Sequence, residues 1–447
     1  MSKPNTKPSS AYFSSGPCKK RPGWDTAKFD FETLGRSHRA KSAKAKLIEV
    51  IDKSKEILKL PKDYHVGIIA ASDTGAVEAA MWNLLGPNGV EVLAWESFGL
   101  DWAKTITDQL KIDGTNVHKA DYGKLPNLAK VDFSKDVLFN WNGTTSGVRV
   151  PNANWIPQDR KGLTICDATS AVFAMNMEFK KLDVITWSWQ KVLGGEAAHG
   201  MMALSPKAVE RLENYTPNWS VPKIYRLTKK GKFADDVFKG ATINTPSMLC
   251  VEDALDAMAW VESIGGLSGS VKRSENNLEV VKHWVKESHW IDFLCDDHDN
   301  LSSTSICLKI KDKSFLDLDE EIQKSKIKEI NTILEKENVA YDINSYRTAP
   351  PGFRIWGGST VETSDIENLG AEFYGRVNYG KNSEYSIISD SVVGKHDNFL
   401  GHFLHGLKLK SYEFKKYKTK KETRLISINV LGNKNKPSVQ NQLKFKA

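Results

Sequence analysis

Short runs of consecutive apolar residues alternate with helix-like patterns through the first 205 residues. The runs are apolar on successive rather than alternate positions, which is typical of strands buried on both faces of a sheet. Between the first runs, Gly75–Leu85 and Leu100–Leu110 space their apolar residues as helices do. Strand, helix and strand in succession predict right-handed crossovers, a mainly parallel sheet and hence an α/β domain. The predicted strands are Tyr64–Ala71, Val90–Trp95, Asp136–Trp141, Gly162–Cys166, Leu182–Trp187 and Gly200–Leu204.

A second, smaller domain is predicted where this regular alternation stops. Two helical patterns, Ser247–Ser263 and Val271–Glu287, lead into it. The remainder is typical of an α+β arrangement with one charged amphipathic helix and three strands. The helix is Asp319–Glu337, and the strands are Thr304–Ile310, Val339–Ile343 and Phe353–Trp356.

The pattern changes again after Ile366. Ser364 and Asp365 form a helix start signal, so a closing amphipathic helix is expected there. The sequence soon turns, however, to Gly, Asn, Ser and Tyr and then to KLKSYEFKKYKTKKETR. We therefore predict a large domain with an N-terminal arm over residues 1–265, a small domain over 266–369 and an atypical extension over 370–447.

The net charge of +8 is concentrated in this extension. From Gly370 to Ala447 there are 15 Lys or Arg against 6 Asp or Glu, whereas residues 1–369 hold 48 against 49. A basic surface over the whole fold, of the kind that nucleic-acid-binding proteins carry, is therefore not predicted. A solvated charged segment is the simplest interpretation of the extension, and a nucleic-acid-binding arm is the alternative.

Composition indicates a soluble globular chain with a sizeable core. Hydrophobic residues make up 40% of the 447, but no apolar run is long enough to cross a bilayer. The start, MSKPNTKPSS, lacks the apolar run of a secretory signal. The 5 cysteines are scattered and include no C-x-x-C pair. We expect a reducing, cytoplasmic setting, no disulfide framework and no metal site.

An aspartate and a lysine follow two of the predicted strands. Asp167 comes directly after Cys166 in CDATSAVFAM, and Lys191 follows Trp187 in TWSWQKVLGGEAAHG. In a parallel sheet both emerge at the carboxyl edge, where open α/β folds bind ligands. A lysine there can form a Schiff base with an aldehyde, and an opposing aspartate can keep a pyridinium nitrogen protonated; pyridoxal phosphate (PLP) needs this pairing. Taken alone, Asp167 is also explained as a strand-end cap, and Lys191 as a surface lysine.

Other strand ends supply groups that suit a flat, phosphorylated ligand. Asp73 and Thr74 lie in SDTG, between a strand and its helix, where hydroxyls and backbone N–H groups can bind phosphate. Asn142–Thr145 follow another strand, and a threonine hydroxyl there could reach the ring or the phosphate. Phe98 and Trp102 could stack on the ring, although aromatics in such places are commonly core residues.

Arginines far apart in the sequence suggest a substrate with more than one anionic group. Arg39 lies beside His38 in GRSHR, and Arg347 and Arg354 lie in SYRTAPPGFRIWGG. A guanidinium group binds carboxylate or phosphate bidentately, so these arginines could clamp a substrate that carries both. Taken singly, each is better explained as a surface ion pair.

With these segments identified, the chain resembles the phosphoserine aminotransferase family, in the class V branch of fold-type I PLP enzymes. The similarity runs from about Phe13 to about Ile366, and FSSGPCKKRPGW, GRSHR, DATS, WSWQKVLGG, INTPS and FRIWGG recur in order. The resemblance implies a fold-type I PLP transferase with a large mainly parallel-sheet domain and a smaller α+β domain. It also implies a homodimer that transfers an amino group between L-glutamate and 3-phosphohydroxypyruvate in serine biosynthesis.

The resemblance also assigns roles to individual residues. Lys191 corresponds to the Schiff-base lysine and Asp167 to the partner of the pyridine nitrogen. At the cofactor phosphate, the resemblance implies Asp73 and Thr74 in the phosphate loop and Gln190. Asn244 and Thr245 would reach the phosphate in the other subunit. At the ring, it implies Thr145 nearby and Phe98, or as second choice Trp102, stacked on it. The substrate-binding residues would be His38, Arg39, Arg347 and Arg354. Where many relatives have a His-Arg pair, this chain has Tyr346 before Arg347 with an altered spacing.

Alternatives to this function stay open at the level of sequence. Another class V aminotransferase, of the alanine or serine-glyoxylate type, shares the cofactor chemistry. A cysteine desulfurase is less favoured, because Cys166 lies within a predicted strand and Cys250 in an apolar helical pattern. A nucleic-acid-binding protein acting through the basic extension is the candidate from a different class.

The extension has a resemblance of its own. NFLGHFLHGLKLKSYEFKKYKTKK is similar to the end of the non-catalytic N-terminal domain of leucyl aminopeptidases, without the catalytic domain that would follow. We expect no peptidase activity, because no two-metal carboxylate site accompanies it. A gene fusion or a reading-frame artefact is the favoured explanation of the extension.

Overall fold

The computed structural model describes residues 6–382, 412–417, 425–430 and 441–444. The chain divides into two compact units, one spanning Pro4–Tyr374 and the other containing Gly375–Ala447. All residues predicted to form the site belong to the first unit. The division of this first unit into a large domain over 1–265 and a small domain over 266–369 stays a prediction.

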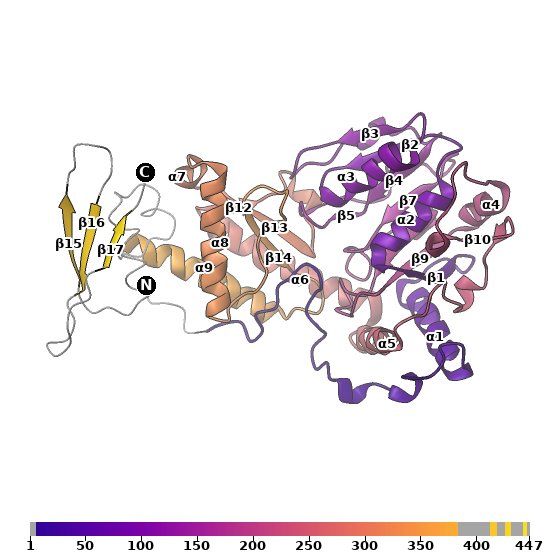
Figure 1. The fold of residues 1–447 in the computed structure, drawn as a ribbon, viewed down its shortest axis with the longest axis horizontal. Coiled ribbons are helices and arrows are strands. Elements are labelled where there is room, and N and C mark those ends of the chain that lie inside the picture. The colour runs from indigo at the N-terminus through magenta and orange to yellow at the C-terminus, as the bar shows by residue number, and fades with distance from the viewer. Residues whose placement is uncertain (1–5, 383–411, 418–424, 431–440, 445–447) are drawn as a thin grey trace. The chain divides into compact units, whose positions relative to one another are not determined.

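The first unit is built on a seven-stranded sheet in the order β1-β9-β8-β7-β4-β2-β3 (Figure 1). The five strands β3, β2, β4, β7 and β8 run parallel, whereas β9 is antiparallel to both of its neighbours. The predicted mainly parallel α/β architecture is therefore confirmed, and each of the six predicted strands is present. The strands are β1 (His65–Ala70), β2 (Val90–Ala94), β3 (Asn116–Lys119), β4 (Asp136–Asn140), β7 (Thr164–Asp167), β8 (Val184–Ser188) and β9 (His199–Leu204).

Helices between the strands cover the sheet. The helix α2 (Ser72–Leu84) begins directly after β1, and its buried alanines, valine and methionine pack into the core with β8 and β9. Its Gly75 is required, because a Cβ there would collide with the carbonyl oxygen of Ala70. The helix α3 (Ser97–Lys104) continues as a π-helical turn over Thr105–Leu110. The first turns of α2 and α3 are thereby placed at the carboxyl edge of the sheet.

Other helices complete this part of the chain. The helix α1 (Lys41–Leu58) packs beside α5 (Met248–Ser263), and α4 (Pro206–Asn214) follows β9 (Figure 1). The small hairpins are β5 (Asn142–Gly143) with β6 (Val148–Arg149), and β10 (Thr228–Lys229) with β11 (Lys232–Phe233). The 3-10 helices are Thr26–Lys28, Phe31–Thr33, Leu128–Lys130, Phe179–Lys181, Lys223–Tyr225, Val237–Lys239 and His298–Asn300.

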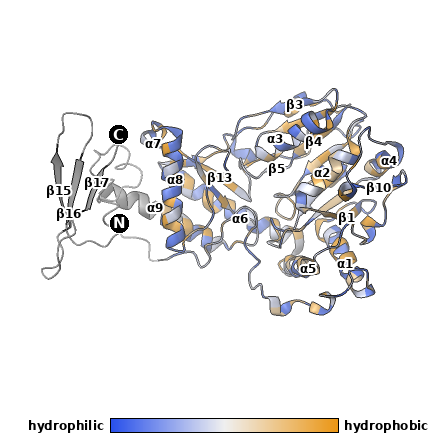
Figure 2. Ribbon diagram, viewed as in Figure 1, coloured by the Kyte–Doolittle hydropathy of each residue, from blue (hydrophilic) through white to orange (hydrophobic). Residues whose placement is uncertain are grey.

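A three-stranded antiparallel sheet follows the long helix α6 (Gly266–Glu287). The helix α8 (Glu320–Lys336) belongs to this part of the chain. Figure 2 shows both hydrophilic and hydrophobic residues along it, as expected for an amphipathic helix packed on a sheet. Helix α9 begins at Thr363, next to the predicted start signal, and continues to Asn382. The remaining elements are β12 (Ile291–Phe293), β13 (Ser305–Ile310), β14 (Gly352–Trp356), α7 (Lys313–Leu316) and α8 (Glu320–Lys336).

The predicted strand Val339–Ile343 is wrong. These residues form a turn with isolated bridges, one of which joins Tyr341 to Tyr12 of the N-terminal arm. The physical reason is the backbone: Asn338 and Asp342 have φ of 53° and 56°, which an extended strand does not allow. The apolar residues are nevertheless buried, so the pattern reflected burial rather than strand pairing.

The second unit contains three antiparallel strands, β15 (Tyr412–Tyr417), β16 (Leu425–Val430) and β17 (Asn441–Lys444). Most of the aminopeptidase-like segment lies outside the described residues, and only its part over 412–417 falls within them. No helix in the described part of the chain is long and apolar enough to span a membrane.

Candidate active site

Two neighbouring parallel strands bring the predicted aspartate and lysine to one cavity. Strand β7 ends at Asp167, which is in register with Thr186 of β8. Strand β8 ends at Ser188, and Lys191 follows after a short turn. The cavity has a volume of about 270 Å³ and is lined by Gly16, Pro17, Ser72, Asp73, Thr74, Phe98, Trp102, Asp167, Thr169, Gln190, Lys191 and Ala197.

Lys191 places a buried amine at the cavity. Its side chain is buried, and Nζ donates a hydrogen bond to the backbone carbonyl of Ser15. Burial lowers the pKa of Lys191, and the positive charge of Arg354 lowers it further, while Cys18 and the acids of the cavity act in the opposite direction. A lysine whose pKa is lowered holds more of its amine neutral, and the neutral amine is the nucleophile.

Asp167 is held by donors from three different elements. Its Oδ2 accepts the indole N–H of Trp102 at 3.1 Å and lies 3.4 Å from the side-chain amide of Asn140. Its Oδ1 accepts the backbone N–H of Thr169 at 3.1 Å. Burial raises the pKa of Asp167, while hydrogen bonds from Asp73, Thr169 and Trp102 and the charge of Lys191 oppose the rise. The carboxyl is thus fixed in orientation at the cavity wall.

Asp73 lies next to Asp167 in the first turn of α2. It is buried and faces Asp167 and Thr186. Burial, and then the neighbouring Asp167, raise the pKa of Asp73 well above its usual range. Two adjacent buried carboxyls do not readily ionise together, so a protonated Asp73 can donate to Asp167. Ser72 and Thr74, on either side of Asp73, also line the cavity at the start of α2.

The two candidate aromatic residues differ in their surroundings. Both line the cavity. Trp102 is buried and its N–H is directed at Asp167, whereas Phe98 is only half-buried. The ring centroid of Phe98 lies 5.8 Å from that of Tyr346. Phe98 therefore has the more accessible ring face.

Thr145 does not line the cavity. Its hydroxyl donates to Oε2 of Glu96 at 2.7 Å, and its backbone N–H lies 3.2 Å from the same oxygen. Asn244 and Thr245 also lie outside the cavity and are exposed in the segment before α5. Their exposure leaves them available to a neighbouring molecule.

Two of the candidate substrate arginines contact the ring of one tyrosine. The guanidinium carbons of Arg347 and Arg354 lie 5.4 and 5.5 Å from the ring centroid of Tyr346. Arg347 is exposed, whereas Arg354 is half-buried on β14 and its Nε is buried without a partner in the described part of the chain. Arg354 acts electrostatically on Lys191, which places it near the cavity.

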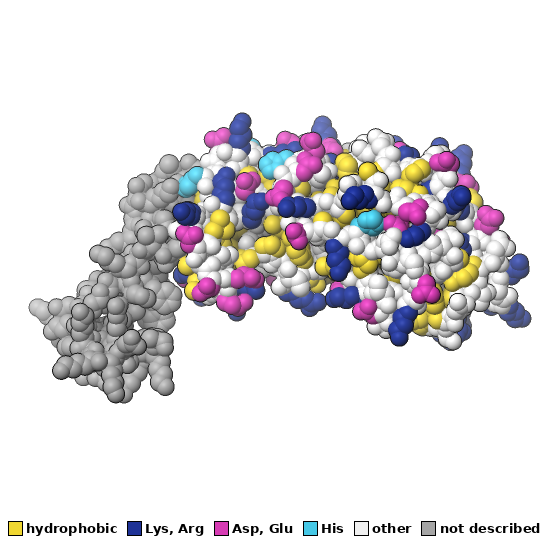
Figure 3. Space-filling model, turned by 90° about the horizontal axis from the view of Figure 1, so that it is seen from above, with side chains coloured by type: hydrophobic (Ala, Val, Ile, Leu, Met, Phe, Trp, Pro, Cys, Tyr) yellow, Lys and Arg dark blue, Asp and Glu magenta, His cyan; other side chains and the backbone are white. Residues whose placement is uncertain are grey.

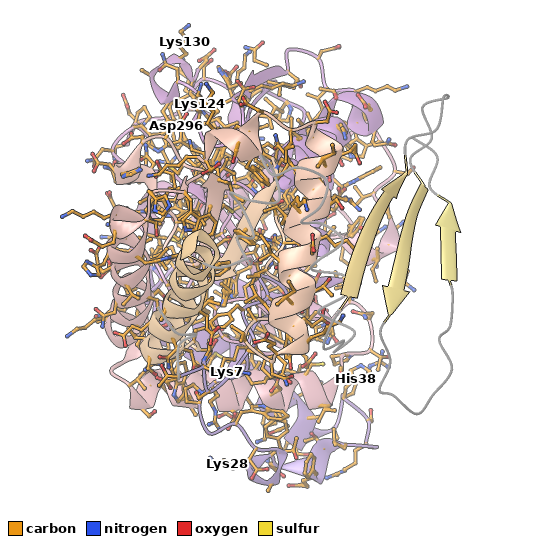
Figure 4. All side chains as sticks on the ribbon, turned by 90° about the vertical axis from the view of Figure 1, so that its left-hand side faces the viewer. Lys7, Lys28, His38, Lys124, Lys130 and Asp296 are labelled. Carbon is orange, nitrogen blue, oxygen red and sulfur yellow. The ribbon has the colours of Figure 1, made fainter. Side chains whose placement is uncertain are left out.

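His38 and Arg39 are not among the residues lining the cavity. They lie in the turn before α1, where His38 is half-buried and Arg39 exposed. Figure 4 shows His38 at the same end of the molecule as Lys28, away from Lys124 and Lys130.

Sequence reasoning missed the contribution of the N-terminal arm. Gly16 and Pro17 line the cavity, and a Cβ on Gly16 would collide with the amine of Lys191. The arm is irregular, so no hydrophobic period could reveal this contact; the glycine and proline of FSSGPCKKRPGW were the available signal. Thr169 and Glu96 were missed as well.

The cavity fits PLP in its donor set. Thr169 Oγ1 and Gln190 Oε1 are buried without a hydrogen-bond partner in the described part of the chain, and both residues line the cavity. A phosphate oxygen would accept a hydrogen bond from the Thr169 hydroxyl, whereas Oε1 of Gln190 is an acceptor and would need an N–H or O–H donor. The amine of Lys191 and the carboxyl of Asp167 complete the set that the cofactor requires.

The cysteines near the site are not arranged as nucleophiles. Burial raises the pKa of Cys18 to about 12 and that of Cys166 well above its usual range, so both thiols stay protonated. Among the described residues, no group of three or more His, Cys, Asp or Glu side chains could hold a metal ion.

A larger cavity of about 680 Å³ lies elsewhere, between Trp141, Arg149 and the α6 residues Glu275 and Glu279. It contains none of the predicted site residues. On the face shown in Figure 3, basic and acidic side chains are interspersed. That face offers no continuous basic surface.

Comparison with known proteins finds relatives that are similar to most of this chain. The chain is 55% identical over 367 residues to the phosphoserine aminotransferase of Methanosarcina mazei, covering 82% of this chain and 96% of that protein. The phosphoserine aminotransferase of Methanosarcina barkeri matches to the same extent. No family model matches the chain.

Solved structures share the fold. The phosphoserine aminotransferase of Cytophaga hutchinsonii superposes with a TM-score of 0.70 at 20% identity, covering 82% of this chain and 99% of that one. A PLP-bound phosphoserine aminotransferase from Trichomonas vaginalis superposes with a TM-score of 0.64 at 16% identity, with coverage of 82% and 99%. At these identities the likeness concerns the fold alone. The identity to the two Methanosarcina proteins over nearly their whole length decides the family, and the chain belongs to the phosphoserine aminotransferase family.

Proposed function

We propose that this protein is a PLP-dependent phosphoserine aminotransferase, which transfers an amino group between L-glutamate and 3-phosphohydroxypyruvate in serine biosynthesis. The observation that carries the proposal is that Lys191 and Asp167 line one cavity at the carboxyl edge of the sheet. The family membership and the PLP-bound relative support it. As an enzyme of amino-acid biosynthesis with free cysteines, it is expected in a reducing cytoplasm.

The residues that would hold PLP come from several strand ends. Lys191 would bind its aldehyde carbon and Asp167 its ring nitrogen. Ser72, Thr74 and Gln190 would bind its phosphate, with the N–H groups at the start of α2. The half-exposed Phe98 is the preferred residue for stacking on the ring, with Trp102 directed at Asp167.

When bound, PLP supplies an electron sink for the negative charge that develops at the α-carbon of the substrate. Nζ of Lys191 takes the proton from that α-carbon, a role for which a lowered pKa is suited. Asp167 keeps the ring nitrogen protonated. The buried walls around Lys191 exclude water from the reacting atoms. Because one product would leave before the second substrate enters the same cavity, with the amino group retained in between, ping-pong kinetics are expected.

Recognition of the substrate is assigned to the arginines. Arg354, with Arg347, would bind the carboxylate or phosphate of the substrate, and both guanidinium groups contact the ring of Tyr346. Arg39 and His38 would contribute the other anion-binding group. His38 and Arg39 lie in the turn before α1, outside the cavity, and could reach a site only by contacting another subunit or after a loop movement.

We propose a homodimer for a related reason. Asn244 and Thr245 are exposed and outside the cavity of their own chain. In the proposed dimer they reach the PLP phosphate of the partner subunit. Thr145 would contribute to the ring environment through its bond to Glu96.

An assay of the purified full-length chain with PLP, glutamate and 3-phosphohydroxypyruvate tests this function. Lys191→Ala is expected to abolish turnover and the visible absorbance of the bound cofactor. The matched control is Lys207→Ala, which removes another lysine whose pKa is lowered by burial but which lies outside the cavity. Normal turnover by Lys191→Ala would disprove the mechanism. Equal turnover of unphosphorylated hydroxypyruvate would instead favour another class V aminotransferase.

A further inference from the structure

Glu96 is a buried carboxyl close to the cavity, and so far it has entered only as the partner of Thr145. It follows β2 and directly precedes α3, and it is 1% exposed. Its Oε1 accepts the backbone N–H of Gly99 at 2.9 Å and the side-chain amide of Asn140 at 3.1 Å. Its Oε2 accepts the hydroxyl of Thr145 at 2.7 Å and the backbone N–H of Thr145 at 3.2 Å. Both oxygens are therefore engaged, by groups from α3, from β4 and from the loop after it.

These bonds connect Glu96 to Asp167 by two routes. The amide of Asn140 that donates to Glu96 also lies 3.4 Å from Oδ2 of Asp167. Helix α3, which Glu96 caps through Gly99, carries Trp102, and Trp102 donates to the same Oδ2 at 3.1 Å. Glu96 therefore holds both of these side-chain donors to Oδ2. It holds Asn140 directly, and it holds Trp102 through the first turn of α3.

We propose that Glu96 is a positioning residue that fixes the Oδ2 atom of Asp167 for its contact with the ring nitrogen of PLP. The inference rests on the proposed function, because it concerns the same site. Glu96 does not line the cavity, so it acts through Asn140 and Trp102 rather than by touching the cofactor.

The electrostatic surroundings of Glu96 agree with a role of this kind. Burial raises the pKa of Glu96 to about 7, the charge of Asp167 adds to the rise, and the bonds from Thr145 and Gly99 oppose it. Cys307 on β13 is the other titratable group that interacts with it. Within the described part of the chain, no lysine, arginine or histidine forms an ion pair with Glu96. A buried carboxyl without a cation costs stability, which is typical of residues that serve a site.

Three variants separate positioning from simple helix capping. Glu96→Gln keeps the shape but turns one acceptor into a donor, which leaves Thr145 or Gly99 unpaired. Glu96→Asp keeps a good helix cap but is too short to hold Asn140 and Thr145 as well. Glu91→Gln is the matched control, because Glu91 is an equally buried glutamate of β2 whose partners are His118 and Lys135.

The first measurement is the dissociation constant of PLP, obtained by titrating cofactor-free protein and following absorbance. We expect it to rise about tenfold in Glu96→Gln and by about threefold or more in Glu96→Asp, as the loss of buried hydrogen bonds predicts. Glu91→Gln should stay within about twofold of the native protein. Native PLP affinity in Glu96→Asp would overturn the proposal, because capping alone would then explain Glu96. If Glu96→Gln does not fold, the dissociation constant of PLP for Glu96→Asp, which retains the helix cap, tests the proposal.

A second measurement needs no cofactor. The indole N–H resonance of Trp102 in cofactor-free protein is identified by its loss in Trp102→Phe. It should shift in Glu96→Gln and stay in place in Glu91→Gln. An unmoved resonance in Glu96→Gln would contradict the link from Glu96 to Asp167. If the native protein binds no PLP, the proposed function fails, whereas this resonance still tests the link.

Discussion

Two buried glutamates at opposite ends of β2 have opposite electrostatic surroundings. Glu91, near the start of the strand, lies 2.9 Å from Lys135 and also contacts His118 and Asn116. Burial raises its pKa, but these partners outweigh burial and leave the pKa lowered. Glu96, just past the end of the strand, has hydrogen bonds but no cationic partner among the residues that the structure describes, and its pKa is raised to about 7.

The same contrast holds for the two edges of the sheet. Asp136, at the start of β4, is fully buried and pairs with Arg211 at 2.8 Å. At the carboxyl edge, Asp73 and Asp167 lie side by side with raised pKa values. Glu91 and Asp136, at the start of their strands, are paired with cations, whereas Asp73 and Asp167 line the cavity at the carboxyl edge. Perturbed acids gathered in a cavity are typical of a functional site.

The largest effect that tests this contrast is expected from Asp167→Asn. An amide cannot keep a ring nitrogen protonated, so turnover should fall by about a thousandfold while PLP remains bound. The measurement is turnover per mole of bound PLP, with PLP quantified by absorbance. Asp136→Asn is the control at the opposite edge and should lower the melting temperature without changing turnover per folded molecule. A decrease of less than about tenfold in Asp167→Asn would contradict the electronic role.

A smaller effect is expected in the pH dependence of stability. The pKa of Glu96 is raised in the folded state, so its contribution to the free energy of unfolding is greatest below pH 4.5 and declines as the pH rises to about 7. The decline amounts to about 3 kcal/mol. The stability deficit of Glu96→Gln relative to the native protein should therefore shrink as the pH rises. For Glu91, whose pKa is lowered, the deficit of Glu91→Gln should grow as the pH rises towards 4.5 and stay constant above it.

Urea unfolding at pH 5 and pH 8 measures the trend for Glu96→Gln, and unfolding at pH 4 and pH 5 measures the trend for Glu91→Gln. Parallel pH dependence of the two deficits would remove the contrast between the two ends of β2. A deficit of Glu96→Gln that does not change with pH would show that Glu96 is ionised normally.

The fold was predictable where local pattern and tertiary burial agree. Successive apolar positions located the six main strands, and the carboxyl-edge rule for parallel sheets predicted a shared cavity for Asp167 and Lys191. Strand β3 was missed because its four residues are exposed or half-buried and give no apolar run. Val339–Ile343 was mistaken for a strand because burial in a turn produces the same apolar run.

The site was less predictable because several of its contacts depend on chain segments without regular structure. The N-terminal arm supplies Gly16 and Pro17 to the cavity, yet nothing in its hydrophobic pattern indicates where it lies. Glu96 was not distinguishable from Glu91 in the sequence, since each glutamate lies in an apolar segment at one end of the same strand. Only the positions of Lys135 and His118 decide which of the two is compensated.

The central claim, that Lys191 is the amine that binds PLP, is tested most directly by covalent trapping. The purified full-length chain is incubated with PLP, reduced with borohydride, digested and analysed by mass spectrometry. The account predicts that the mass of reduced PLP is found on the peptide containing Lys191 and is lost in Lys191→Ala. Labelling of a different lysine, or a Lys191 peptide that stays unmodified while PLP is bound, would contradict it.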